Sequence, residues 1–473
     1  MANTNRPDRT CILTLQADRP GGVPTVVDWW HTFLTRWGHQ PTVLYAAFEG
    51  EGINYWQRLM LTLRMWRLHP RPEHPHPTLA NAPLPAPLWM LYFVPQWVFG
   101  KVLDRFDQIV VAGGPCLHAL PLALRRMPYV LWISTLYEDE LKGKTLTGDE
   151  WARRVLKSPT WPILAWQERL VLRRASQILA HSPYARRRIL ETVPEVADRL
   201  DLAMVPIDSG RFRPLPPQAR AETQERYLLN VSRINDPRKN IPLLLDAFTR
   251  IAVRYPALKL VLAGDEPQSA LLSQCERLGI GGSVIFRGKV PPDELAELYQ
   301  RAELFVISSA QEGLGIVMLE AMACGTPVVA TDCGGPEGIV IDGETGRLVP
   351  NNEPETLAAA VLDLLDHPAR LEAMRERCVA FVHQNCTQSV VERTLYSHFT
   401  RAFPASQAGR QNIFEVGVPA PDAGATKQKA SLREGLALAW VVVVLAAYAQ
   451  HQAAIHGASI WARLIKPLLS AIR

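Results

Sequence analysis

Two glutamates and two glycines within residues 308–331 have the clearest chemical use in this chain. Glu312 and Glu320 stand eight positions apart. Gly313 and Gly315 are the first and third residues after Glu312. Glycine lets a backbone approach a ligand closely, and a helix beginning near Gly315 would direct free amides and a positive dipole end at an anion. Because two carboxylates near a phosphate would be repelled, we expect them to face neutral hydroxyl groups. The alternative is an acid at a helix N-terminus followed by an exposed helical glutamate.

A basic loop follows a predicted strand earlier in the chain. Arg233 and Lys239 both come after the strand 227–231. A guanidinium fork and an ammonium group together suit a diphosphate. The alternative is a solvated basic loop with no ligand. A second strand, 258–263, ends at Gly264, which taken alone is a weak signal.

These residues sit in a half of the chain that alternates short apolar strands with helices, a pattern typical of a parallel sheet covered on both faces. The predicted strands are 227–231, 258–263, 284–286, 304–307 and 328–331, and the predicted helices are 241–255, 270–278, 292–301, 316–324, 354–365 and 369–382. Ligands bind at the carboxyl ends of the strands in such sheets, so the basic loop and the glutamate segment should meet there.

The first half opens in the same way. A strand at 10–15 runs into a glycine-containing turn at 19–23, a helix at 25–37 and a second strand at 42–45. Later strand candidates follow at 109–112, 129–133 and 178–180. A proline-rich stretch at 204–217 is interpreted as a linker. We therefore predict an α/β fold with two doubly wound, Rossmann-like domains facing a cleft, followed by a C-terminal helical tail.

Composition excludes several other classes. The chain has 473 residues, of which 48% are hydrophobic and 21% charged, so it is neither disordered nor fibrous. Seven cysteines without a C-x-x-C pair argue against a disulfide framework and a zinc site, and favour a reducing cytosol. Residues 1–10 are polar and predict no signal peptide. The net charge of +5 comes from a basic first half, an acidic second half and a basic tail, without a motif for nucleic-acid binding.

The order of these features resembles the retaining glycosyltransferases of family 4, which have the GT-B fold and a Glu-x7-Glu motif. The resemblance is specific over about 225–370 and thin over 1–220. The residues that carry it are 312–315, 319–331, 334–336, 342–343, 346 and 348–350 in the second half, and 20–23 and 180–186 in the first.

The resemblance implies a metal-free catalytic centre. Arg233 and Lys239 would neutralise the diphosphate of a nucleotide sugar and stabilise the leaving group, a task that a metal ion performs in other enzymes. Glu312 would hold the donor sugar. Arg238 stands at the spacing from Arg233 that is more common in the family, but Lys239 is preferred because it precedes Asn240 and the next helix.

The resemblance also implies a nucleotide-binding set. Glu320 would hold the ribose hydroxyls, and backbone amides at the helix start would add to the diphosphate site. Gly22, in the first domain, would approach the donor phosphate or the acceptor across the cleft. The complete set is Gly22, Gly264, Gly313, Leu314, Gly315, Ile316 and Glu320.

Two features of the first half depart from the family. Many relatives place a histidine against the donor sugar, but the matching stretch 131–137 has none. His118 and His181 are nearby alternatives, although we interpret each as a structural histidine. The run 138–140, Glu-Asp-Glu, is not a D-x-D metal motif, and we interpret it as a solvated acidic turn.

Two regions predict contact with a membrane. Residues 54–68 combine Arg, Trp and Leu without an acid, which suits a membrane interface; the alternative is a buried helix that shapes the acceptor pocket. The tail holds an apolar run at 436–449, short for a span of about 20 residues, and an apolar stripe at 460–472 flanked by cations. A single span, an interfacial helix or packing onto the protein's own domains would each explain the tail.

We thus predict a metal-independent retaining glycosyltransferase without a separate cofactor. It would transfer a hexose from a UDP- or GDP-sugar to a glycan or lipid-linked acceptor, in the cytoplasm at an anionic membrane face. The alternatives are a catalytically silent nucleotide-sugar-binding scaffold and another GT-B reaction such as epimerisation. The predicted segments are a first domain at 1–207 with an insertion at 52–100, a linker at 208–226, a second domain at 227–403, a flexible linker at 404–431 and a membrane-associating tail at 432–473.

Overall fold

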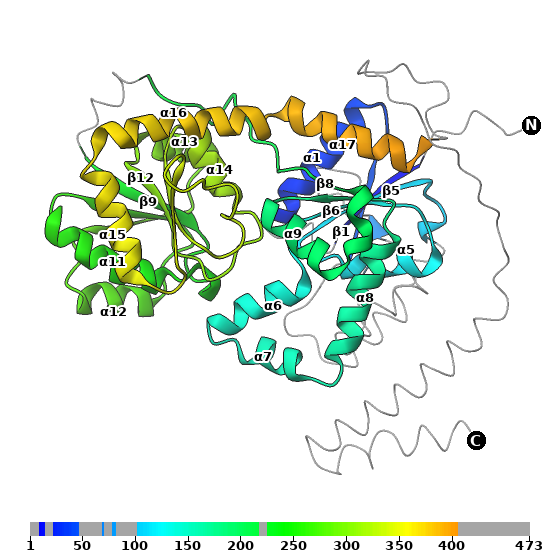
Figure 1. Ribbon diagram of the computed structural model, residues 1–473, viewed down its shortest axis with the longest axis horizontal. Coiled ribbons are helices and arrows are strands. Elements are labelled where there is room, and N and C mark those ends of the chain that lie inside the picture. The colour runs from blue at the N-terminus through cyan, green and yellow to red at the C-terminus, as the bar shows by residue number, and fades with distance from the viewer. Residues whose placement is uncertain are drawn as a thin grey trace, which may run out of the picture. The chain divides into compact units, whose positions relative to one another are not determined.

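The computed structural model contains two parallel sheets with helices on their faces (Figure 1). The chain divides into two compact units, Met1–Ile413 and Phe414–Arg473, and every residue described below belongs to the first. The segments predicted to contact a membrane, 54–68, 436–449 and 460–472, lie outside the described residues. Within the described part no helix is long and apolar enough to cross a bilayer. The described residues are 9–14, 22–46, 69–70, 78–81, 102–216 and 225–404.

The first sheet has eight strands in the order β3-β4-β2-β1-β5-β6-β7-β8. They are β1 (Thr10–Thr14), β2 (Thr42–Ala46), β3 (His69–Pro70), β4 (Thr78–Asn81), β5 (Gln108–Gly113), β6 (Val130–Ile133), β7 (Gln177–Ala180) and β8 (Leu200–Leu202). All neighbours are parallel except β3 and β4. Ile12 lies opposite Val43 and Val110, and every residue of β1 is buried, as expected for a strand covered on both faces.

Helices cover this sheet through apolar stripes. In α1 (Gly22–Arg36) the buried residues Val26, Trp30 and Phe33 recur at helical spacing, and Trp30 packs edge-on against Trp132 of β6 at 5.7 Å. The remaining helices of this half are η1 (Leu117–Ala119), α5 (Leu120–Arg125), α6 (Tyr137–Leu146), α7 (Glu150–Lys157), α8 (Trp161–Arg174), α9 (Pro183–Thr192) and η2 (Pro194–Arg199).

The second sheet has six parallel strands in the order β11-β10-β9-β12-β13-β14. They are β9 (Tyr227–Ser232), β10 (Lys259–Gly264), β11 (Val284–Gly288), β12 (Leu304–Ile307), β13 (Val328–Thr331) and β14 (Gly346–Val349). The helices are η3 (Pro237–Lys239), α11 (Ile241–Arg254), α12 (Ser269–Arg277), α13 (Pro292–Arg301), α14 (Ile316–Ala323), α15 (Pro354–Leu365) and α16 (Pro368–Asn385). The switch of order at β9 and β12 is where ligands bind in doubly wound folds.

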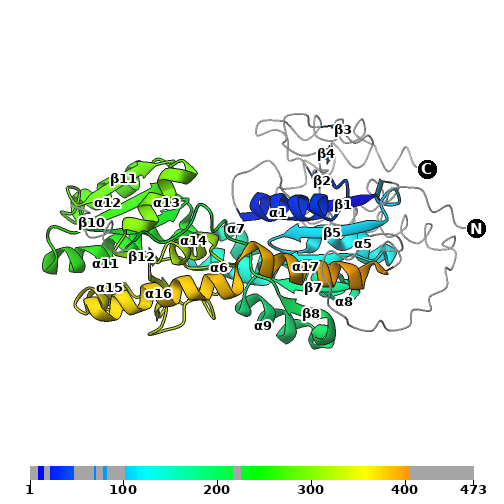
Figure 2. The same ribbon diagram turned by 90° about the horizontal axis from the view of Figure 1, so that it is seen from above.

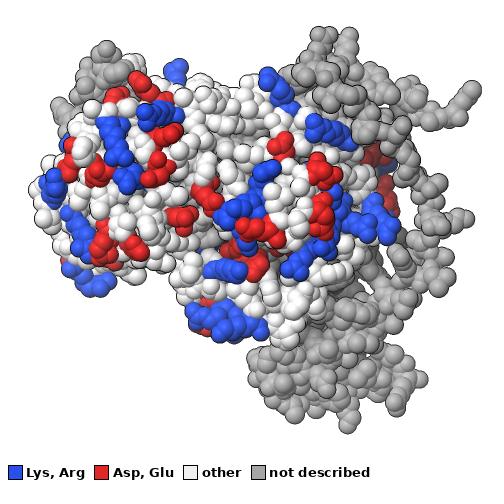
Figure 3. All heavy atoms as spheres, in the orientation of Figure 1, with Lys and Arg blue, Asp and Glu red and all other residues white. Residues whose placement is uncertain are grey.

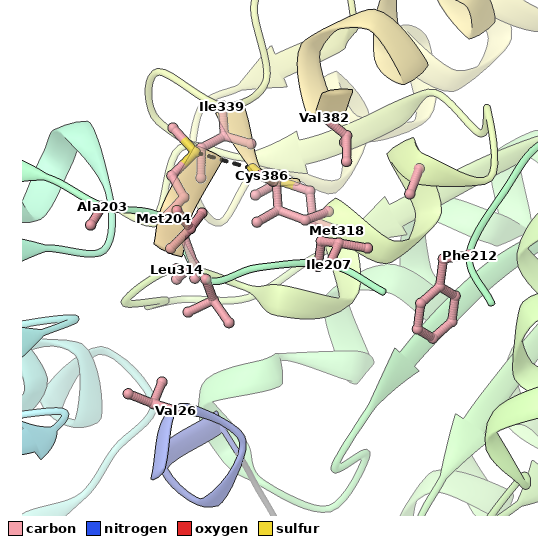
Figure 4. Packing of buried hydrophobic residues seen from close by; sticks show 14 of the residues in the cluster. Val26, Ala203, Met204, Ile207, Phe212, Leu314, Met318, Ile339, Val382 and Cys386 are labelled. Carbon is pink, nitrogen blue, oxygen red and sulfur yellow. Dashed lines mark hydrogen bonds between the residues drawn. The ribbon is translucent and has the colours of Figure 1, made fainter. Parts of the chain in front are cut away.

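The chain crosses between the sheets twice, and the two crossings are joined. Ile207 N donates to Cys386 O at 2.8 Å, and the Cys386 thiol lies 3.5 Å from the sulfur of Met204 (Figure 4). After the second crossing, α17 (Gln388–Ala402) packs against β6 and β7 of the first sheet (Figure 2). There the buried Glu392 accepts from the indole of Trp37 and pairs with Arg36. The last described helix is therefore part of the first domain's packing.

Most predicted elements are confirmed. The predicted strands of both halves are present within one or two residues, as are the helices at 241–255, 292–301 and 354–365. The sequence did not predict the short strands β3, β4, β8 and β14, nor the helices α5, α6, α7, α8, α9 and α17. α6 and α9 are rich in charged residues, and β8 is only partly buried, so their sequences lack a clear apolar period.

The close contact of β9 and β10 at their carboxyl ends requires a glycine at position 264. Gly264 has φ +146, and a Cβ there would lie 1.7 Å from the carbonyl oxygen of Ser232. We expect Gly264→Ala to lower the unfolding free energy by at least about 3 kcal/mol, measured as a drop in melting temperature. Gly281→Ala is the control, because no heavy atom lies within 4 Å of its added Cβ. An equal melting temperature for the two variants would contradict this account.

Candidate functional site

The carboxyl ends of β9, β12 and β13 are tied together by side-chain hydrogen bonds to backbone. Ser308 Oγ donates to Lys239 O at 2.9 Å, and Thr331 Oγ1 donates to Ser309 O at 2.6 Å. Ala310 N donates to Arg238 O at 2.7 Å, so the loop after β12 runs alongside η3. These bonds hold the two predicted catalytic segments in contact.

Lys239 and Glu312 form an ion pair at this edge. Their Nζ and Oε1 atoms lie 2.5 Å apart, and the side chains are only 17% and 12% exposed. Ser309 Oγ donates to the same carboxylate oxygen at 2.8 Å. The backbone of Glu312 is fixed on both sides, by a bond from its N to Cys333 O and by a bond from Gly335 N to its O. An anion binding at Lys239 would therefore compete with, or join, the carboxylate already there.

The two neighbouring arginines have a different partner. Asp236 Oδ2 lies 2.8 Å from Nη2 of both Arg233 and Arg238. Burial opposes ionisation of Asp236, but the hydrogen bonds and charge of Arg238, with the charge of Arg233, hold its pKa below the usual value. Arg238 is mostly buried, whereas the Arg233 side chain is 55% exposed. In the structure the ion-pair partner of Glu312 is thus Lys239, whereas Arg238 pairs with Asp236.

The glycine loop between the two glutamates is closely packed. Gly315 has φ +79 and directly precedes α14, so it occupies a conformation that favours glycine. A Cβ at Gly313 would lie 3.0 Å from Ser134 Oγ, and Ser182 Oγ donates to Gly313 O at 3.0 Å. The Leu314 side chain is buried in the apolar cluster (Figure 4), which leaves its backbone as the part that a ligand could meet.

Glu320 is held in a separate, more apolar environment. Tyr299 Oη donates to Glu320 Oε2 at 2.9 Å, and the Tyr299 ring packs edge-on against Phe212 and Phe305. Burial raises the pKa of Glu320 to about 7, although the Tyr299 hydrogen bond and the charge of Arg211 lower it. A carboxyl group poised between its two forms can both donate and accept, which suits contact with hydroxyl groups.

Gly22 of the first half lies opposite α14. It is the first residue of α1, and a Cβ there would lie 3.6 Å from Cδ1 of Ile316. Gly264 lies against Ser232 at the end of β9, as described above. The structure thus brings Gly22 to Ile316, and Lys239 to Glu312, while Glu320 is held by Tyr299.

The polar residues singled out in the first half are buried or half-buried. His181 packs edge-on against Trp132 at 4.8 Å, and burial lowers the pKa of His181 to about 3 and that of His118 to about 4. The interpretation of 138–140 as a solvated acidic turn is wrong. These residues form the first turn of α6, and Asp139, only 5% exposed in its side chain, is paired with Arg188 of α9 at 3.0 Å.

Four positioning residues were missed in the sequence: Ser309, Asp236, Tyr299 and Ser182. Ser309 and Asp236 each lie three residues from the side chain that they hold, so local spacing could have indicated them. Tyr299 and Ser182 act on residues 21 and 131 positions away, and no local pattern marks them. In the described ranges His, Cys, Asp and Glu side chains form no group of three or more that could hold a metal ion.

Comparison with known families agrees with this architecture. Residues 212–380 match the family model of glycosyl transferases group 1, and residues 20–205 match that of glycosyltransferase family 4. The first match covers the second sheet, and the second match covers the first sheet except for β1. Each of the two models matches less than half of the chain, and both are similar to it over the described sheets. The predicted fold, two Rossmann-like domains of the GT-B type, is confirmed, whereas the predicted C-terminal helical tail lies outside the described residues.

Curated relatives carry glycosyltransferase names. A D-inositol 3-phosphate glycosyltransferase from Segniliparus rotundus is 34% identical over 42% of this chain and 46% of its own length. A GDP-mannose-dependent alpha-(1-6)-phosphatidylinositol monomannoside mannosyltransferase from Mycolicibacterium smegmatis is 34% identical over 47% of this chain and 64% of its own length. The chain thus spans about half to two thirds of the length of these relatives.

Solved structures share the fold. Sucrose-phosphate synthase from Thermosynechococcus elongatus superimposes with a TM-score of 0.64 at 20% identity, over 84% of this chain and 100% of that one. Anabaena HepE in complex with UDP gives 0.61 at 18% identity, over 83% of this chain and 99% of that one.

The environment of Glu320 predicts a pH-dependent stability. Its pKa is about 7 when folded, against 4.5 for a free side chain, so the folded state binds the extra proton between these values. Stability from this group is therefore complete below about pH 4.5 and is lost as the pH rises through 7. Glu320→Gln does not titrate, and we expect it to exceed the wild type in stability by up to roughly 3 kcal/mol at pH 8, with equal stability near pH 4.5.

Urea denaturation of both proteins at pH 4.5 and pH 8 measures this difference. Glu276→Gln, at an exposed position of α12, is the control and should follow the wild type at both values. A Glu320→Gln variant that is less stable than the wild type at pH 8 would show that the carboxylate stabilises the fold.

Proposed function

We propose that the protein is a metal-independent retaining glycosyltransferase that transfers a hexose from a nucleoside-diphosphate sugar, UDP- or GDP-linked, to a glycan or lipid-linked acceptor. The observation that carries the proposal is the partly buried pair of Lys239 and Glu312 at the carboxyl ends of the second sheet's strands. A cation and a carboxylate in contact give one group for the diphosphate and one for the sugar hydroxyls beside it.

Charge on the leaving group would be stabilised by side chains. Arg233 is more than half exposed, and Lys239 pairs with Glu312, which directly precedes the glycine loop; we therefore place the diphosphate between these cations and the start of α14. In the proposed reaction the bond from the sugar's anomeric carbon to the phosphate oxygen breaks. The acceptor oxygen bonds to that carbon from the same face, and its proton passes to the leaving phosphate. Cations that favour the departing diphosphate lower the barrier of this step without a protein nucleophile.

The assignments of the donor's ribose and of the acceptor rest on Glu320 and on the relatives respectively. Glu320, with a pKa near 7 and a bond from Tyr299, is suited to ribose hydroxyl groups. The names of two relatives contain inositol 3-phosphate and a phosphatidylinositol mannoside, which supports a phosphorylated or lipid-linked acceptor. We therefore place the reaction at the cytosolic face of a membrane, with the protein bound peripherally or by its tail.

Donor binding is tested by the melting temperature. Because a ligand that binds only the native state raises it, we expect one class among UDP-, GDP-, ADP- and dTDP-sugars, at about 100 times its Kd, to add about 2.7 kcal/mol of stability. EDTA should leave the shift unchanged. A shift abolished by EDTA and restored by Mg²⁺ or Mn²⁺ would overturn the metal-independent donor site, and no shift with any donor would favour a silent protein.

Turnover tests the assigned residues. We expect Lys239→Ala, Arg233→Ala and Glu312→Gln each to lower sugar transfer by about 10²–10³-fold in samples that remain folded, since each removes a group that acts on the transition state. Lys239→Ala and Glu312→Gln should also lower the melting temperature, because each leaves one partner of the ion pair alone. Lys289→Ala, at an exposed position of the same domain, is the matched control. If Arg238→Ala abolished transfer while Lys239→Ala remained active, the choice between these neighbours would be reversed.

A further inference from the structure

The helices α6 and α7 present large apolar side chains to solvent. Six large hydrophobic residues are exposed among the described residues, and two of them, Leu146 and Trp151, lie on either side of the turn that joins these helices, 59% and 45% exposed. The turn is tight, because Asp149 N donates to Lys144 O at 3.1 Å. The Lys144 ammonium lies 5.9 Å from the centre of the Trp151 ring. We call this surface the α6–α7 surface.

Cations dominate the exposed face of α7. Arg153, Arg154 and Lys157 recur on one side of the helix, while Ala152 on the other side is buried against the domain. Glu150 is the one acid in this helix, and it is paired with Arg153. Lys142, in the middle of α6, is 57% exposed and is paired with Glu138, as Lys144 is with Glu140. Figure 3 shows Lys and Arg side chains over this part of the molecule, with Asp and Glu side chains beside them.

This combination fits an anionic lipid surface. A helix that lies flat on headgroups presents cations to the phosphates, and a Trp and a Leu beside those cations can enter the boundary between headgroups and acyl chains. Each Lys or Arg near such a surface is attracted to the negative lipid headgroups, and salt screens this attraction. The acid-poor face of α7 is complementary to a membrane of net negative charge.

The same helix α6 reaches the candidate site. A Cβ at Gly143 would lie 2.2 Å from Cβ of Gln311, the residue before Glu312, so the Gln311 side chain packs against the backbone of α6 there. Gly143 and Leu146 are one helical turn apart, about 5 Å along the axis. A membrane touching Leu146 would thus lie close to the glutamate assigned to the donor sugar.

We propose that the α6–α7 surface docks the protein on anionic lipid and brings the site to an acceptor held in that membrane. This rests on the membrane-facing part of the proposed function, but it names a surface distinct from the segments in which the sequence predicted membrane contact. Donor binding by the second domain does not depend on it.

A fluorescent probe at position 146 tests the surface in the full chain. All seven cysteines of the protein are buried and free, so Leu146→Cys introduces one exposed thiol for an environment-sensitive dye. Leu272→Cys on α12, at a position 43% exposed in the wild type, is the matched control. We expect phosphatidylglycerol-containing vesicles to shift the emission of the probe at 146 to shorter wavelength and leave the probe at 272 unchanged. Phosphatidylcholine vesicles should affect neither.

Vesicle flotation tests the charges. Arg154→Glu with Lys157→Glu should weaken binding to the anionic vesicles by about tenfold or more, and Arg277→Glu on α12 should not. Trp151→Ala should weaken binding at high salt, where the apolar contact remains.

Three results would overturn the proposal: no flotation of the wild type, flotation without a shift at position 146, or equal shifts at 146 and 272. The second would assign membrane binding to another part of the chain, and the third would indicate unspecific adsorption. A donor-induced rise in melting temperature, measured on the same samples, separates failure of this surface from failure of the proposed function.

Discussion

The ion pair of Lys239 and Glu312 is the contact around which the candidate site is organised. Its two side chains come from loops that follow different strands of the second sheet, and both are mostly removed from water. Leaving one charge of such a pair alone is costly, so the surrounding structure has to keep them together. The hydrogen bonds of Ser308 and Ser309 do so, one through the backbone of Lys239 and one through the carboxylate of Glu312.

Two glutamates eight residues apart have different electrostatic surroundings. Glu312 faces an ammonium group and a hydroxyl, whereas Glu320 lies among apolar side chains and accepts from Tyr299. Burial therefore raises the pKa of Glu320 to about 7. Such separation of neighbouring carboxyl groups by their environment is a common way for one site to contain groups with distinct roles.

Elements of the first half complete the surroundings of the glycine loop. Ser182 donates to Gly313 O, Ser134 lies against the same glycine, and Gly143 of α6 lies against Gln311. A larger side chain at Gly313 or Gly143 would meet these neighbours, so the small residues on both sides are matched. The helix α6 thus connects the site to the α6–α7 surface, and links a proposed catalytic residue with a proposed lipid contact.

The sequence alone determined the two sheets and predicted the sheet edge at which the candidate site would lie. Apolar strands alternating with helices predict doubly wound sheets, and the carboxyl ends of their strands necessarily bring Arg233, Lys239 and Glu312 to one edge. Only the tertiary structure shows that Glu312 pairs with Lys239 and that burial raises the pKa of Glu320. It also shows that Asp139 is buried and paired with Arg188. The polar helices α6 and α7 and the short strand β14 are likewise seen only in the tertiary structure. The surroundings of Glu320 and of the glycine loop depend on pairs such as Tyr299 with Glu320 or Ser182 with Gly313, whose members are distant along the chain. The periodicity of apolar residues reflects only local secondary structure and the burial of one face. Contacts between residues that are distant along the chain therefore cannot be predicted from it.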